Sequence, residues 1–114
     1  MAEERVLALD EDNFDETIQS RPGIILVDFR ASWCAPCKKL EPILVELIEE
    51  LAGPATLVRV DVDENGDLAN RFGVRSIPTL VLFQDGRIVD RMIGLHSKSE
   101  IRNRIDRVSE SGAS

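Results

Sequence analysis

Two cysteines separated by two residues are the most chemically distinctive feature of this 114-residue sequence. Cys34 and Cys37 follow an apolar run, 24–29, and precede a segment with helical periodicity, which predicts Cys34 at or just before the first turn of a helix. Unpaired backbone N–H groups and the positive end of the helix dipole favour thiolate over thiol at such a position. The pattern therefore predicts Cys34 as an exposed nucleophile and Cys37, one turn further in, as the shielded thiol that resolves a mixed disulfide.

Two other interpretations of the cysteine pair are less consistent with the sequence. A zinc site would need two more ligands, and besides the pair the chain has no cysteine and a single histidine, His96. A purely structural disulfide would close a loop too small to constrain the unfolded chain much. Redox chemistry is the interpretation that remains, and we predict no metal and no cofactor.

Asp28 interrupts the apolar run 24–29 with a carboxylate. It could be a polar residue at a strand end, but its apolar neighbours indicate that it is buried. Burial without a partner is costly for a carboxylate and raises its pKa. Asp28 is therefore a candidate proton acceptor.

The composition is that of an ordinary globular protein, with 43% hydrophobic and 31% charged residues, and the length suits one domain spanning 1–114. A net charge of -7 argues against nucleic acid or an anionic membrane as a partner. No secretory signal or membrane-spanning run is visible. We expect a cytoplasmic monomer.

The periodicity alternates between strands and helices. A short first strand is followed by a helix capped by Asp12, and a long helix containing Pro42 begins near Cys34. An Asp-Gly pair between the last two apolar runs predicts a hairpin. The remaining elements are strands at 57–62, 79–83 and 87–93, a short helix around 68–72, a last helix after Ser97 and a frayed tail at 109–114.

The segments 27–29 (VDF) and 31–38 (ASWCAPCK) resemble the active site of the thioredoxin family, usually written WCGPCK. Further matches are Pro42, 61–63 (DVD), 74–79 (VRSIPT) and Gly94, so the resemblance covers about 14–108. It implies an α/β fold, the thioredoxin fold, with a central five-stranded mixed β-sheet flanked by four α-helices. It also implies a thiol–disulfide oxidoreductase that reduces protein disulfides and is regenerated by thioredoxin reductase.

The resemblance also implies roles for residues around the cysteines. The peptide bond between Ile77 and Pro78 should be cis, and Asp28 should help to deprotonate Cys37. A shallow groove should hold an extended client segment by backbone pairing at Ser76 or Ile77, which gives broad specificity. The implied groove residues are Trp33, Pro36, Arg75, Ser76, Ile77, Pro78 and Gly94.

Four positions are candidates for tuning this chemistry. Arg59 stands near where family members often carry Lys, and could either extend toward Asp28 or face solvent. Lys38 could add positive potential near the thiols or face solvent. Ala35 replaces the Gly of the family dipeptide, and Arg30 stands where many members have Trp, which leaves the redox potential and the choice of partners open.

Two alternative functions belong to the same fold. One is an oxidase or isomerase of an oxidising compartment, which a measured redox potential would distinguish. The other is a non-catalytic subunit that binds a partner through the same groove, which a turnover assay would distinguish.

Overall fold

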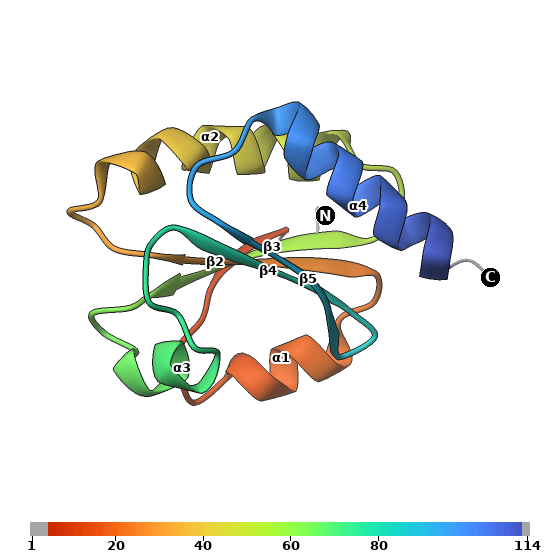
Figure 1. Ribbon diagram of the computed structural model, residues 1–114. Helices are drawn as coiled ribbons and strands as arrows, with labels where there is room; N and C mark the ends of the chain where they lie inside the picture. The colour runs from red at the N-terminus through yellow and green to blue at the C-terminus, as the bar shows by residue number, and fades with distance from the viewer. Residues whose placement is uncertain (1–4, 113–114) are drawn as a thin grey trace.

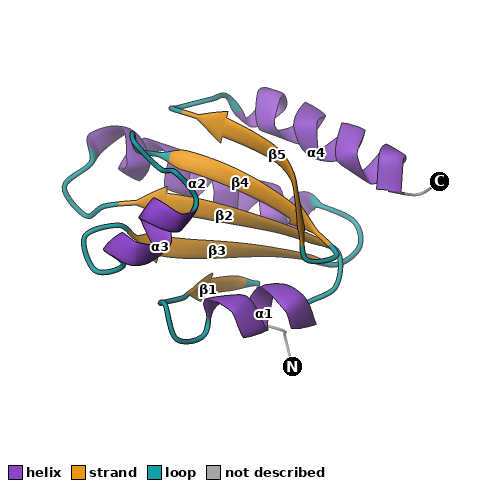
Figure 2. Cartoon of the chain, turned by 60° about the horizontal axis from the view of Figure 1, so that its bottom comes forward, coloured by secondary structure: helices purple, strands orange, loops and turns teal. Residues whose placement is uncertain are grey.

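The computed structural model describes residues 5–112, which form one five-stranded sheet and four helices. The strand order is β1-β3-β2-β4-β5 (Figure 2). Strands β1, β3 and β2 are parallel to one another, and β4 runs antiparallel to both of its neighbours, β2 and β5. The predicted mixed sheet and helix number are confirmed. The elements are β1 (Val6–Ala8), α1 (Phe14–Ser20), β2 (Ile24–Arg30), α2 (Ala35–Glu50), β3 (Ala55–Asp61), α3 (Gly66–Arg71), β4 (Thr79–Gln84), β5 (Arg87–Ile93) and α4 (Lys98–Gly112).

The sheet is covered on both faces, by α2 and α4 on one side and by α1 and α3 on the other (Figure 1). Successive side chains of a strand point to opposite faces, so the central strand β2 supplies both cores. Ile24 and Leu26 join the cluster under α2 and α4, whereas Val27 and Phe29 join the cluster under α1 and α3. The same alternation puts Asp28 on the α2 face.

Strand β3 carries Arg59 to the same face, because Leu57 packs in the cluster under α2 and Arg59 follows two positions later. Asp28 and Arg59 are direct register partners of the parallel β2–β3 pair. On the other side of β2, Asp28 is paired with the buried Leu80 of β4. The carboxylate therefore has one cationic and one apolar neighbour across the sheet.

The β4–β5 hairpin has a two-residue turn, as the Asp-Gly pair predicts. Asp85 and Gly86 have φ angles of 55° and 79°. Two successive positive φ values are the conformation that joins twisted antiparallel strands, and Asp followed by Gly adopts it readily.

Two details of the helices differ from the sequence predictions. Asp12 does not cap α1: Asn13 is the N-cap residue, and the Asp10 carboxylate accepts hydrogen bonds from the backbone N–H groups of Asp12 and Asn13 at 2.9 and 3.2 Å. Helix α4 extends to Gly112, so the helical backbone covers most of the predicted tail, while 113 and 114 lie outside the described residues. No helix within 5–112 is long and apolar enough to cross a membrane.

Candidate active site

The two cysteines form a disulfide at the N-terminus of α2, directly after β2. Cys34 is the N-cap residue, with extended backbone angles, and Cys37 lies in the first turn. The Cys37 backbone N–H donates a hydrogen bond to the Cys34 Sγ at 3.2 Å. Because this N–H is one of the groups that a helix start leaves without a backbone acceptor, it would stabilise a thiolate on Cys34 after reduction.

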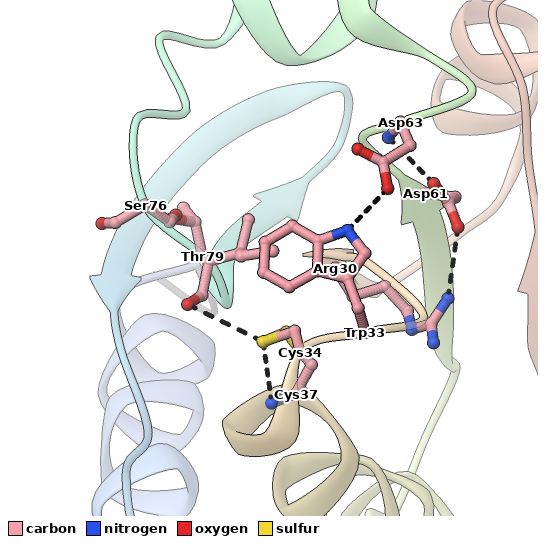
Figure 3. Close-up of a disulfide and its surroundings, with 9 residues drawn as sticks. Arg30, Trp33, Cys34, Cys37, Asp61, Asp63, Ser76 and Thr79 are labelled. Carbon is pink, nitrogen blue, oxygen red and sulfur yellow. Dashed lines mark hydrogen bonds and ion pairs between the residues drawn. A yellow bond between two sulfur atoms is a disulfide. The ribbon is translucent and has the colours of Figure 1, made fainter.

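Both cysteines of the disulfide are almost completely buried. The exposed fraction is 4% for Cys34 and 1% for Cys37, so the order of exposure is as predicted but Cys34 is far less open than expected. The exposed group is the neighbouring Trp33, at 67%. Its indole Nε1 donates a hydrogen bond to Oδ2 of Asp63 at 2.7 Å, which fixes the ring beside the disulfide (Figure 3).

The second half of the chain meets the disulfide at a cis peptide bond. The bond lies between Ile77 and Pro78, as predicted, and the Ile77 carbonyl oxygen is 4.0 Å from the Cys34 Sγ. The Thr79 hydroxyl donates to the Ser76 carbonyl at 2.6 Å, and the Gly94 N–H donates to the Pro78 carbonyl at 2.8 Å. These bonds hold the 76–79 segment and the residue after β5 together.

A shallow hollow of about 190 Å³ lies between Trp33 and the segment before the cis proline. Three of the predicted groove residues besides Trp33 line it, namely Arg75, Ser76 and Ile77. Three further lining residues were not predicted, Val62, Ala69 and Val74. Val62, Ala69 and Val74 are apolar, and an apolar residue in the sequence can line a groove as well as fill a core. They could therefore not be assigned to the groove before the fold was known.

The other predicted groove and tuning residues differ in how far they are exposed. Ala35, Pro36 and Lys38 are exposed in the first turn of α2, and Pro78 is buried. Gly94 is half-buried and has a φ of 91°. Lys38 thus faces solvent, which was one of its two expected placements.

Asp28 is 1% exposed, and neither of its carboxylate oxygens has a hydrogen-bond partner among the described residues. Burial is the main cause that raises its pKa from 3.8 to about 7. Arg30 and Arg59 act in the opposite direction, and the negative charge of Glu41 raises the pKa further. The predicted buried carboxyl with a raised pKa is confirmed.

The two arginines near Asp28 are each paired with another acid. Arg59 forms an ion pair with Glu41 of α2, with Nη2 and Oε2 2.7 Å apart, and makes no hydrogen bond to Asp28. Of the two placements left open for Arg59, a bond to Asp28 is not formed, and the partly exposed side chain is paired with the less deeply buried carboxylate of Glu41. Arg30 lies 3.7 Å from Asp61, which offsets the positive charge expected at the rim (Figure 3).

No group of three or more His, Cys, Asp or Glu side chains in the described part of the chain is arranged so that it could hold a metal ion. His96 is 3.0 Å from the Ile93 carbonyl oxygen through Nε2 and 3.6 Å from Glu100 through Nδ1. It lies beside the start of α4 and away from the cysteines in sequence, and we assign it no catalytic role.

Comparisons of the sequence and of the structure with known proteins both find thioredoxins. The family model described as Thioredoxin matches residues 5–107. A thioredoxin of Staphylococcus haemolyticus is 44% identical over 102 residues, which cover 90% of this chain and 96% of that protein. A thioredoxin of Staphylococcus aureus is 39% identical with the same coverage.

The solved structure of a mutant thioredoxin from Halobacterium salinarum superposes with a TM-score of 0.84 at 34% identity, covering 94% of this chain and 95% of that one. The fold, the disulfide at the helix start and these likenesses agree. The chain therefore belongs to the thioredoxin family, and its Cys34–Cys37 pair is the dithiol–disulfide centre of a thiol–disulfide oxidoreductase.

Proposed function

We propose that the chain reduces disulfide bonds in client proteins, with Cys34 as the attacking thiol and Cys37 as the resolving thiol. The observation that carries the proposal is the hydrogen bond from the Cys37 N–H to the Cys34 Sγ at the start of α2. This donor stabilises negative charge on the attacking sulfur, and among the described residues the Cys37 Sγ accepts no such hydrogen bond.

In the first step the Cys34 thiolate attacks one sulfur of a client disulfide. A bond forms between Cys34 and that sulfur, and the other client cysteine leaves as a thiolate and takes a proton from solvent. In the second step the Cys37 thiolate attacks the Cys34 Sγ and releases the second client thiolate. Two electrons pass from the dithiol to the client, and the Cys34–Cys37 disulfide remains.

The second step requires that Cys37 lose a proton, and Asp28 is the proposed acceptor, directly or through a water molecule. A carboxyl with a pKa of about 7 can be ionised and still accept a proton near neutral pH. The buried position of both residues favours transfer within the protein over exchange with bulk solvent.

The client segment is proposed to lie extended over Trp33, Pro36, Ile77, Pro78 and Gly94. Backbone pairing at Ser76 or Ile77 would bind many sequences with little selection by side chains. The exposed Arg75 and the apolar hollow beside Trp33 would add contacts at the edge of this groove.

The oxidised protein is proposed to be reduced again by thioredoxin reductase, in a reducing compartment such as the cytoplasm. The test is reduction of insulin disulfides driven by NADPH and a thioredoxin reductase, comparing the natural chain with Cys34→Ser. We expect turnover by the natural chain and none by the variant. No turnover by the natural chain would contradict the proposal, and a strongly oxidising potential would favour the oxidase or isomerase instead.

A further inference from the structure

Glu41 lies on α2 one turn after Cys37, so the two side chains are neighbours on one face of the helix. Its side chain is 28% exposed, and its Oε2 lies 2.7 Å from Nη2 of Arg59, whose side chain is 35% exposed. The helix that carries the resolving cysteine therefore also carries the acid that binds the arginine opposite Asp28.

Arg59 has a second acid within reach in the sheet. It is the register partner of Asp28 on the neighbouring strand, and the alternation of β2 and β3 puts both side chains on the α2 face. Both carboxylate oxygens of Asp28 and the Nε of Arg59 are buried and lack a hydrogen-bond partner. If the Arg59 side chain turned toward Asp28, hydrogen bonds between the two could satisfy these atoms. Arg59 therefore has two carboxylates within reach, and in the structure it is paired with Glu41 and not with Asp28.

We propose that Glu41 is a positioning residue that holds the Arg59 guanidinium away from Asp28 and so sets the pH at which Asp28 gives up its proton. The catalytic consequence rests on the proposed function, in which the Cys37 thiol passes its proton to the Asp28 carboxylate and leaves a thiolate and a neutral acid. The more firmly Glu41 holds Arg59, the stronger a base Asp28 is.

The charged groups around Asp28 are few and come from three elements. Arg30 shares its strand and face but is paired with Asp61 at 3.7 Å. Arg59 comes from β3, and Glu41 and the titratable Cys37 come from α2, whereas β4 contributes Leu80. Arg59 is therefore the cation that faces Asp28 from the neighbouring strand, whereas Arg30, which lowers the pKa of Asp28 more strongly, acts from the same strand and is paired with an acid other than Glu41.

Arg59 also borders a polar hollow of about 330 Å³. Arg30 and Arg59 line it together with the acids Asp10, Asp61 and Glu64. Asp28 is not among the residues that line this hollow, so the hollow bears on the two arginines and not on the carboxylate itself.

The test follows the titration of the Asp28 carboxyl carbon by NMR in the oxidised protein, where no client is needed. In Glu41→Gln the midpoint should fall by about one pH unit or more, because Arg59 is released toward Asp28 and a negative charge is lost. Glu46→Gln is the matched control, since it removes an exposed acid of the same helix that is paired with Lys98, and it should leave the midpoint unchanged. An unchanged midpoint in Glu41→Gln would overturn the proposal, and Glu41→Ala gives a second measurement if that variant folds poorly.

A double-mutant cycle of Glu41 and Arg59 distinguishes two effects of Glu41 on Asp28: the positioning of Arg59, and direct repulsion between the two carboxylates. Glu41→Gln should lower the midpoint much less when Arg59 is already Gln, and an equal fall in both backgrounds would overturn the role of Arg59. The pH profile of single-turnover client reduction should move to lower pH together with the NMR midpoint. If the midpoint moves as expected while Asp28→Asn keeps the full rate, the proton role of Asp28 fails and the placement of Arg59 by Glu41 stands.

Discussion

The Gly94 backbone N–H donates a hydrogen bond to the Pro78 carbonyl oxygen at 2.8 Å, across the cis peptide that faces the disulfide. Gly94 makes this bond with a φ of 91°, a value that side chains with a Cβ rarely adopt. A Cβ added there would meet no atom within 4 Å. The backbone conformation, and not lack of space, is therefore what requires glycine.

Gly94→Ala should destabilise the protein by about 1–3 kcal/mol, because the new residue must either keep the strained φ or lose the bond to Pro78. Client reduction should also show a higher KM if this residue borders the groove. Gly66→Ala is the control: a Cβ at the start of α3 is equally free of contacts and its φ is not positive, so stability should stay equal or rise by about 0.4–1 kcal/mol. Equal loss of stability in both variants in denaturant unfolding would contradict the role of the φ angle.

Cys34 should be alkylated by iodoacetamide at least about ten times faster than Cys37 in the reduced protein, because the helix start stabilises its thiolate. Mass spectrometry of peptides after short exposure to the reagent measures both rates. Cys34→Ser and Cys37→Ser provide the two single-thiol references. Similar rates at both positions would contradict the assignment of attacking and resolving thiols.

Cys37→Ser should accumulate a mixed disulfide between Cys34 and client proteins, since attack can occur and resolution cannot. Non-reducing electrophoresis detects the trapped complex, and added dithiothreitol should release it. Cys34→Ser is the matched variant and should trap nothing. A complex formed by Cys34→Ser alone would reverse the two roles.

Asp28→Ala should stabilise the oxidised protein at pH 7 and above while slowing client reduction. Below pH 3.8 the carboxyl is protonated in both the folded and the unfolded chain and costs nothing. Between pH 3.8 and about 7 the unfolded chain ionises and the folded one does not, so stability of the natural protein falls as pH rises. Above the folded pKa the penalty is complete, at about 4 kcal/mol.

Removal of the carboxylate should therefore raise the free energy of unfolding by about 3 kcal/mol at pH 8, after a packing loss of about 1 kcal/mol, and should lower it by about 1 kcal/mol at pH 3, where only the packing loss remains. Urea unfolding at the two pH values measures the first half of this prediction, and single-turnover reduction measures the second. A variant that is less stable at pH 8 yet fully active would contradict both the cost and the proton role of Asp28.

The sequence was sufficient to predict the burial of Asp28 and the place of the cysteines. Both depend on local patterns: the branched apolar residues before Asp28 and the Phe after it favour a buried strand, and the helical periodicity starts at the cysteine pair. The cis bond before Pro78 was predicted only through the family resemblance, because nothing in the local sequence distinguishes it from the usual trans form.

The partner of Arg59 could not be predicted, because a long side chain can reach several acids and the choice depends on a helix distant in sequence. In the sequence Glu41 is one of several polar residues of the segment that forms α2, and only the fold brings it next to Arg59 of β3. The hydrogen bond between Trp33 and Asp63 is a similar case, since it joins residues 30 positions apart. Asp12 was wrongly assigned as a cap because the polar segment 10–13 offers several candidates. Asn13 is the N-cap residue, and the Asp10 carboxylate accepts hydrogen bonds from the backbone N–H groups of Asp12 and Asn13.

The pairing of β2 with β4 joins the two halves of the chain at the disulfide. Cys34 and Cys37 belong to the first half, whereas Ile77, Pro78 and Gly94 belong to the second. The surface proposed to recognise clients is therefore complete only when β4 has paired with β2, because its residues come from both sides of that pairing.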